Sequence, residues 1–85
     1  MISKQHVMLT AKLYKMRVAA QKLFGEKYKS KTAPYRAYIE KKTVESKKNH
    51  LEVAIDLATE VKSVDDSGIG TMLIFAAAID LIENK

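Results

Sequence analysis

The amino-acid sequence predicts an all-α protein, a small bundle of three long helices that associates into a dimer. Apolar residues recur at helical spacing over most of the 85-residue chain. No stretch alternates apolar and polar residues for long enough to indicate a strand. The three glycines fall at the predicted helix ends rather than inside the periodic stretches. We therefore expect residues 1–85 to form one helical domain.

The first helix is expected to run from about Ser3 to Phe24 and to close at Gly25, because glycine readily adopts the positive φ of a helix C′ position. One apolar stripe predicts the face that packs on the core: Leu9, Leu13, Met16, Ala20 and Leu23. A second stripe lies opposite: Val7, Ala11, Tyr14 and Val18. A helix with two apolar stripes lies between two layers, so we predict that the second stripe is a homodimer interface.

The second helix is expected to follow a basic loop over residues 26–31, with Thr32 as N-cap and Pro34 in the first turn. A helix continuing to about Lys62 is favoured, because one stripe then collects Ala37, Val44, Leu51, Ile55 and Ala58. That continuity would turn Tyr35, Tyr38 and Ile39 outward. The alternative is a kink or split near residues 47–50, with Asn49 and Glu52 as a capping box and the tyrosines in the core.

The third helix is expected after a turn at residues 64–70, with Asp66 or Ser67 as cap, and to end near Glu83. Its middle, MLIFAAAI, is apolar on every side. Such a helix is central or lies in a subunit interface. Gly70 and the alanines at 76–78 would let neighbouring backbones approach it closely.

Charge is divided unevenly along the chain, whose net charge is +5. Residues 1–48 hold thirteen Lys and Arg against three Glu, whereas residues 49–85 hold two Lys against seven Asp and Glu. Such asymmetry indicates a half that binds a polyanion. The alternative is that the two halves neutralise one another within the fold or across a dimer.

Catalytic and metal-binding motifs are not found in the sequence. There is no cysteine, the two histidines have no paired spacing, and no nucleophile lies near a base. Glu52, Asp56 and Glu60 form one helical row, typical of a solvated face or of a dock for a basic partner. The longest apolar run has eight residues, where a membrane span needs about 20. We expect a soluble, cytoplasmic protein without cofactor, metal, membrane partner or enzymatic activity.

The segment 23–42 combines cations with aromatic rings around one glycine and the only proline. Lysine holds phosphates as a mobile point charge, and tyrosine can stack on unpaired bases. Thirteen lysines against two arginines favour sequence-independent binding. The predicted RNA-binding residues are Lys27, Lys29, Lys31, Arg36, Lys41 and Lys42 with Tyr28, Tyr35 and Tyr38, together with a ridge of Lys12, Lys15 and Lys22 on the first helix.

A second hypothesis stays open beside RNA binding. The chain would then be an inhibitor or adaptor that docks a protein partner through its acidic helix face or its apolar stripe, without nucleic acid.

The stretch MRVAAQKLFGEKYKSKTAPYRAYIEKK, followed by an acidic and apolar half, resembles small accessory proteins of T-even-type phages, in particular their inhibitors of host ribonuclease toxins. The resemblance covers the whole chain and rests on its length, charge and general character. It implies a dimeric, antitoxin-like, RNA-binding anti-defence factor that disables a host endoribonuclease in an RNA-dependent complex within the host cytoplasm. It assigns no role to any single residue.

Overall fold

The computed structural model describes residues 4–64 and 67–83, with side chains from residue 11 onward. It holds four α-helices: α1 at Lys4–Phe24, α2 at Tyr28–Ser46, α3 at His50–Val64 and α4 at Ile69–Glu83. A 3-10 turn, η1 at Gly25–Lys27, joins the first two. The described residues include no strand, so the predicted all-α class is confirmed. The predicted count of three helices is wrong, because the second predicted helix is two.

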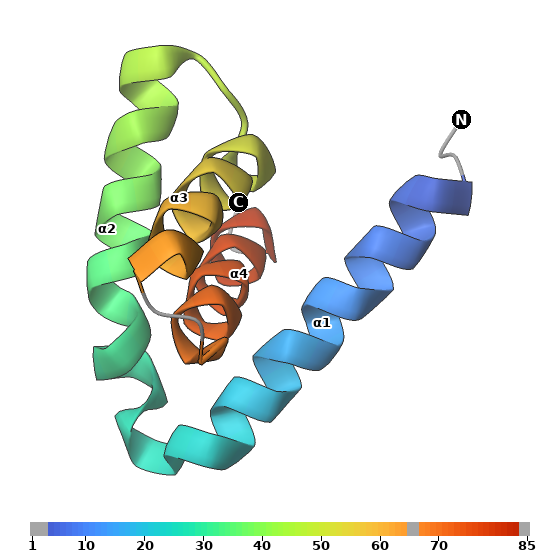
Figure 1. The fold of residues 1–85 in the computed structure, drawn as a ribbon, viewed down its shortest axis with the longest axis vertical. Helices are drawn as coiled ribbons and strands as arrows, with labels where there is room; N and C mark the ends of the chain where they lie inside the picture. The colour runs from blue at the N-terminus through green and yellow to red at the C-terminus, as the bar shows by residue number, and fades with distance from the viewer. Residues whose placement is uncertain (1–3, 65–66, 84–85) are drawn as a thin grey trace.

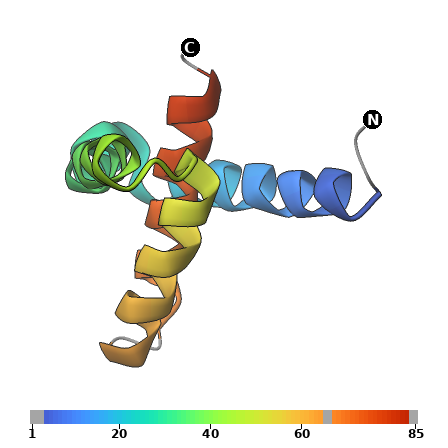
Figure 2. The ribbon, with the colours of Figure 1, turned by 90° about the horizontal axis from the view of Figure 1, so that it is seen from above.

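Helix α4 is the centre of the fold, as its apolar sequence predicts. It packs against α1, α2 and α3, whereas α1 and α3 do not contact each other over the described residues (Figure 1). Ala76, Ala77 and Ala78 are fully buried, because small side chains let the surrounding helices approach on several sides. Seen from above, α1 extends away from one side of the α3–α4 pair (Figure 2).

The core has two parts, one on each side of α4. Where α2, α3 and α4 meet, the buried residues are Ile39, Val53, Ala54, Ala58, Ile74, Ala77 and Ala78. Where α1, α2 and α4 meet, they are Ala20, Tyr28, Leu73 and Ala76. The predicted core stripe of α1 holds at Leu13, Ala20 and Met16 but fails at Leu23, which is exposed in the last turn of the helix. The Leu9 side chain lies outside the described residues.

The chain turns from α1 into α2 at Gly25, whose φ of +54° is readily available to glycine. Helix α2 then begins at Tyr28, so the predicted loop over 26–31 and the N-cap at Thr32 are wrong. Thr32 is instead fully buried in the second turn, where its Oγ1 donates to the carbonyl of Tyr28 at 3.0 Å. Burial of Tyr28 and Thr32 stabilises the helix ahead of Pro34, so the proline lies inside it rather than at its start.

The predicted continuous second helix is wrong, and the alternative split near residues 47–50 is confirmed. Lys47 has a φ of 60° and its N–H donates to the carbonyl of Thr43 at 3.1 Å, which ends α2. Asn49 then caps α3: its Oδ1 accepts from the N–H of Glu52 at 2.8 Å, and its Nδ2 donates to Glu52 Oε1 at 2.9 Å. With α3 folded back, Ile39 is buried and Val44 is exposed, the reverse of the continuous stripe.

The turn between α3 and α4 depends on two glycines. Gly68 has a φ of +83°, and the hydroxyl of Ser67 accepts from the N–H of Ile69 at 3.3 Å. The alternative cap, Asp66, lies outside the described residues. At Gly70, a Cβ would stand 2.7 Å from Cγ1 of Val61, so only glycine permits this approach of α3 to α4. The close packing predicted at Gly70 is therefore confirmed.

Candidate nucleic-acid interface

A polar network ties the corner between α1 and α2 to the end of α4. Asp80 accepts a hydrogen bond from the Tyr28 hydroxyl at 2.7 Å and from Arg17 Nη1 at 3.3 Å. Arg17 also reaches Glu83, donating from Nη2 to Oε1 at 3.1 Å. The Arg17 guanidinium holds the pKa of Glu83 below its usual range. The sequence signal for this network is a single carboxylate, Asp80, directly after the apolar run, and nothing along the chain indicates its partners.

Tyr28 is a structural residue, contrary to its predicted role on the RNA-binding surface. Only 8% of it is exposed, and its hydroxyl is held by Asp80. Burial and the neighbouring Asp80 carboxylate raise the pKa of the Tyr28 phenol. The Tyr28 ring therefore packs inside the junction of α1, α2 and α4 and is not free to stack on a base.

Tyr35 and Tyr38 differ from each other in how far their rings are buried. Tyr35 is half-buried and packs against both parts of the core, so its predicted outward position is wrong, as is that of Ile39. Tyr38 is 38% exposed, with Lys42 Nζ 5.7 Å from the centre of its ring. Of the three tyrosines in the segment, Tyr38 alone presents a ring to solvent. The split of the helix is the reason, because it reverses which face of α2 meets the core.

Arg36 is partly engaged by its own helix. Its guanidinium donates to the Thr32 hydroxyl and, at 3.1 Å, to the carbonyl of Lys29. It also lies 3.8 Å from Asp80, and its side chain is about a quarter exposed (27%). Arg36 is therefore engaged by protein groups and is less available to a ligand than the exposed lysines.

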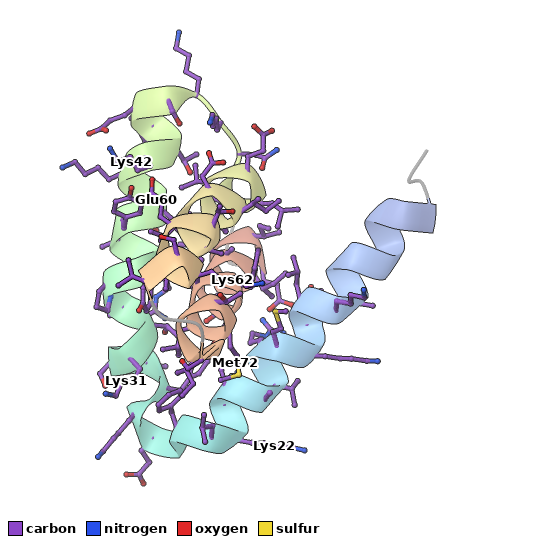
Figure 3. All side chains as sticks on the ribbon, in the orientation of Figure 1. Lys22, Lys31, Lys42, Glu60, Lys62 and Met72 are labelled. Atoms are coloured by element: carbon purple, nitrogen blue, oxygen red, sulfur yellow. The ribbon has the colours of Figure 1, made fainter. Side chains whose placement is uncertain are left out.

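The exposed cations gather where α1 ends and α2 begins. We call this set the basic corner: Lys22, Lys27, Lys29 and Lys31. Glu26 is the one carboxylate in residues 22–36. None of the four lysines forms an ion pair within the part of the chain that the structure describes. Figure 3 shows Lys22 and Lys31 on the two arms of the corner, and Lys31 Nζ lies 6.0 Å from the centre of the Phe24 ring.

Lys41 and Lys42 stand apart from the basic corner. They follow Lys31 by ten and eleven residues, which is about 15 Å along a helix. Lys42 pairs with Glu45 at 3.5 Å and lines a groove between α2 and α3 that also holds Asp56 and Glu60 (Figure 3). The structure therefore does not bring these two cations together with the corner, and carboxylates offset the charge of Lys42.

The ridge and the second stripe predicted on α1 are both largely exposed. Lys12, Lys15 and Lys22 are exposed, as are Ala11 and Val18 of the predicted dimer interface. Tyr14 is half-buried: Arg17 lies 4.9 Å from its ring centre, and its bond to Glu83 raises the pKa of its hydroxyl. The Val7 side chain lies outside the described residues. The homodimer interface stays a prediction.

An apolar groove opens between α1, the end of α3 and the start of α4. Met16, Ala19 and Met72 line it together with Lys15 and Lys62, and Figure 3 shows Lys62 and Met72. A floor of this kind offers no donors to a phosphate, so we do not include it in the nucleic-acid interface. Lys15 and Ala19 also line a second, shallow groove along α1.

The described residues offer neither a metal site nor a membrane-spanning helix. No cluster of three or more His, Cys, Asp or Glu side chains is arranged to hold a metal ion there. No helix in that part of the chain has the length and apolarity needed to cross a membrane.

Comparison of the chain with protein-family models, with curated proteins and with solved structures finds no match.

Proposed function

We propose that this protein binds RNA through the basic corner and acts by holding the RNA rather than by chemical turnover. The observation that carries the proposal is the corner itself: four exposed lysines, none of them ion-paired among the described residues, at the turn from α1 to α2 that the partly buried Tyr28–Asp80 hydrogen bond holds in place. Lysines without an ion-pair partner are available to phosphates, and binding releases the counterions of the nucleic acid.

The chemistry of the corner favours contact with the RNA backbone over recognition of base sequence. Lysine ammonium groups bind phosphate without the planar geometry that reads a base edge. Tyr38 is the one exposed tyrosine of the segment and lies about 15 Å along α2 from Tyr28. A single strand that follows α2 from the corner would reach this ring, where stacking contributes about 1–3 kcal/mol per base.

The resemblance to phage inhibitors of ribonuclease toxins extends the proposal to a biological role. We propose an antitoxin-like factor that uses bound RNA to engage a host ribonuclease, with the RNA as part of the complex. The competing hypothesis, a protein adaptor that works without nucleic acid, predicts a complex that survives nuclease treatment.

The test of RNA binding compares two triple variants that change the net charge equally, from +5 to −1. Lys27→Glu/Lys29→Glu/Lys31→Glu reverses the corner, and Lys47→Glu/Lys48→Glu/Lys62→Glu reverses exposed lysines that lie outside the predicted RNA-binding set. Fluorescence anisotropy with a labelled single-stranded RNA of mixed sequence should show loss of binding for the first, at least about 100-fold, and much smaller loss for the second. Equal losses would mean that net charge, and not the corner, drives binding.

Arg36 is left unchanged in this test because of its bonds to Thr32 and Lys29. Thermal unfolding followed by circular dichroism checks that both variants keep the fold. If the wild-type protein, purified free of nucleic acid, does not bind the RNA at low salt, the proposed function is wrong.

A further inference from the structure

A polar pocket lies beside the basic corner, where α1, α2 and α4 meet. Its volume is about 410 Å³, within the range of about 300–1,000 Å³ that is usual for ligand sites. All three helices contribute to its lining, which consists of Gln21, Tyr28, Lys29, Arg36 and Asp80. Because Lys29 belongs both to this pocket and to the basic corner, a strand whose phosphates contact the corner lies beside the pocket.

The pocket combines hydrogen-bond donors with an acceptor, so it suits an uncharged ligand that offers both. A phosphate has only acceptors and cannot use the Asp80 carboxylate, whose side chain is 17% exposed. A cation has only donors and would meet Lys29 and Arg36. A nucleobase is uncharged and presents donors and acceptors together, and the neighbouring corner can hold the strand that carries it.

Three side chains of the pocket keep free hydrogen-bonding capacity. The Asp80 carboxylate can accept about four hydrogen bonds, and within the described residues it accepts from Arg17 and Tyr28 only. Gln21 is exposed, and its amide forms no hydrogen bond in that part of the chain. The Lys29 amine is exposed and forms no ion pair there. One acceptor on α4 and two donors on α1 and α2 therefore remain available.

Guanine is the base that fits this arrangement. Its N1–H and N2–H groups are adjacent donors on one edge and can both face Asp80, while its O6 and N7 can accept from Lys29 and Gln21. In adenine, cytosine and uracil, each N–H donor lies next to a ring nitrogen or carbonyl oxygen that accepts. A carboxylate facing that donor would also meet the negative partial charge of the acceptor.

We propose that this pocket binds one guanine of the single-stranded RNA whose phosphates contact the basic corner, with Asp80 as the acceptor and Lys29 and Gln21 as the donors. The inference rests on the proposed function. It adds one base-specific position to a surface that otherwise contacts the RNA backbone.

The main test varies the RNA and leaves the protein unchanged, so that folding does not enter the comparison. Fluorescence anisotropy at low salt compares a short labelled oligouridine with the same strand carrying one central guanosine, which should bind at least about tenfold more tightly. Inosine, which lacks the N2 amine, and a guanosine analogue with carbon in place of N7 should each lose most of this gain. Adenosine at that position controls for the larger stacking surface of a purine and should bind like uridine.

Two variants of equal charge test whether the preference arises in the pocket. Lys29→Met removes a donor of the pocket together with one charge of the corner, whereas Lys27→Met removes a charge of the corner alone. Both should weaken binding of oligouridine to a similar extent, and only Lys29→Met should reduce the preference for guanosine. Gln21→Ala, which changes no charge, should reduce that preference as well. Circular dichroism melts check that each variant folds.

Equal affinity for the guanosine and oligouridine strands would overturn this inference and leave the proposed function standing, whereas a wild-type protein that binds neither strand would contradict both. A preference for guanosine that Lys29→Met and Lys27→Met reduce equally would place the base elsewhere and would also overturn it. Guanosine monophosphate should compete weakly, because it brings a single phosphate to the corner. Competition as strong as that of the guanosine strand would identify a free nucleotide as the ligand, against the proposal.

Discussion

At the scale of single residues, Asp80 determines which side chains of the basic segment belong to the fold. It accepts hydrogen bonds from Tyr28 and Arg17 and lies 3.8 Å from Arg36. Arg17 and Arg36 thereby become structural cations, in contrast to the exposed lysines around them. A cluster of cations in a sequence therefore holds two kinds of residue, and burial separates them.

Tyr28→Phe should lower the free energy of unfolding at pH 7 by about 1–3 kcal/mol, because Asp80 loses its buried donor. Tyr38→Phe, at an exposed ring, should change it little. Urea denaturation of the two variants beside the wild type measures both effects. A Tyr28→Phe variant as stable as the wild type would contradict a stabilising role for this bond.

The Tyr28–Asp80 hydrogen bond also predicts how the free energy of unfolding depends on pH in alkaline solution. The pKa of Tyr28 is raised in the folded protein, so its contribution is complete below the unfolded pKa of about 10 and is lost as pH rises. The difference in stability between wild type and Tyr28→Phe should therefore narrow by about 1 kcal/mol between pH 9 and pH 11. Lysine deprotonation affects both proteins alike. A constant difference across this range would contradict the assignment.

At the scale of elements, the split between α2 and α3 decides the surface of the molecule. Lys47 ends α2 in the left-handed conformation, and Asn49 opens α3 with a reciprocal cap. Because α3 then folds back beside α2, Tyr35 and Ile39 face the core. The single apolar stripe predicted for a continuous helix is therefore divided between two helices, which present separate faces.

Asn49→Ala should destabilise the protein by about 1 kcal/mol, since the N–H of Glu52 loses its acceptor. Asn49→Asp keeps an acceptor at the cap and should cost much less. Thermal unfolding of both variants measures the difference. Equal losses would mean that the side chain acts through something other than capping.

At the scale of the whole molecule, the fold concentrates free positive charge at one end of α2. Lys42 is offset by Glu45 at 3.5 Å, whereas the lysines of the basic corner have no such partner among the described residues. The number of cations available to an RNA is therefore smaller than the number in the segment. This difference can be measured through the salt dependence of binding.

Contact of the four corner lysines with four phosphates predicts that affinity for single-stranded RNA falls roughly 50-fold between 50 and 200 mM salt. Six phosphates would give roughly 300-fold over the same range. Anisotropy titrations at several salt concentrations give the slope. A slope that corresponds to six or more phosphates would mean that Lys41, Lys42 or the ridge on α1 also binds the strand.

The sequence by itself determined the helical class, the central position of the last helix, the end of the first helix at Gly25, the close packing at Gly70 and the separation of charge. These features follow from local periodicity, from glycine and from residue counts, all of which are readable along the chain. Thr32 and Pro34 led to a wrong prediction of where the second helix begins. Residue types that favour a helix start carry no information on whether the preceding residues are buried.

Only the tertiary structure decided where the second predicted helix breaks and which tyrosines are buried. Lysine rarely adopts the left-handed conformation, so Lys47 gives no sign of it, and along the sequence the continuous stripe is favoured over the Asn49 cap. The choice between them comes from packing, since folding α3 back buries Ile39 of α2 and Val53 of α3 together with Ile74 of α4. This burial of apolar side chains involves residues far apart in sequence, and for this reason no pattern within one segment could reveal it.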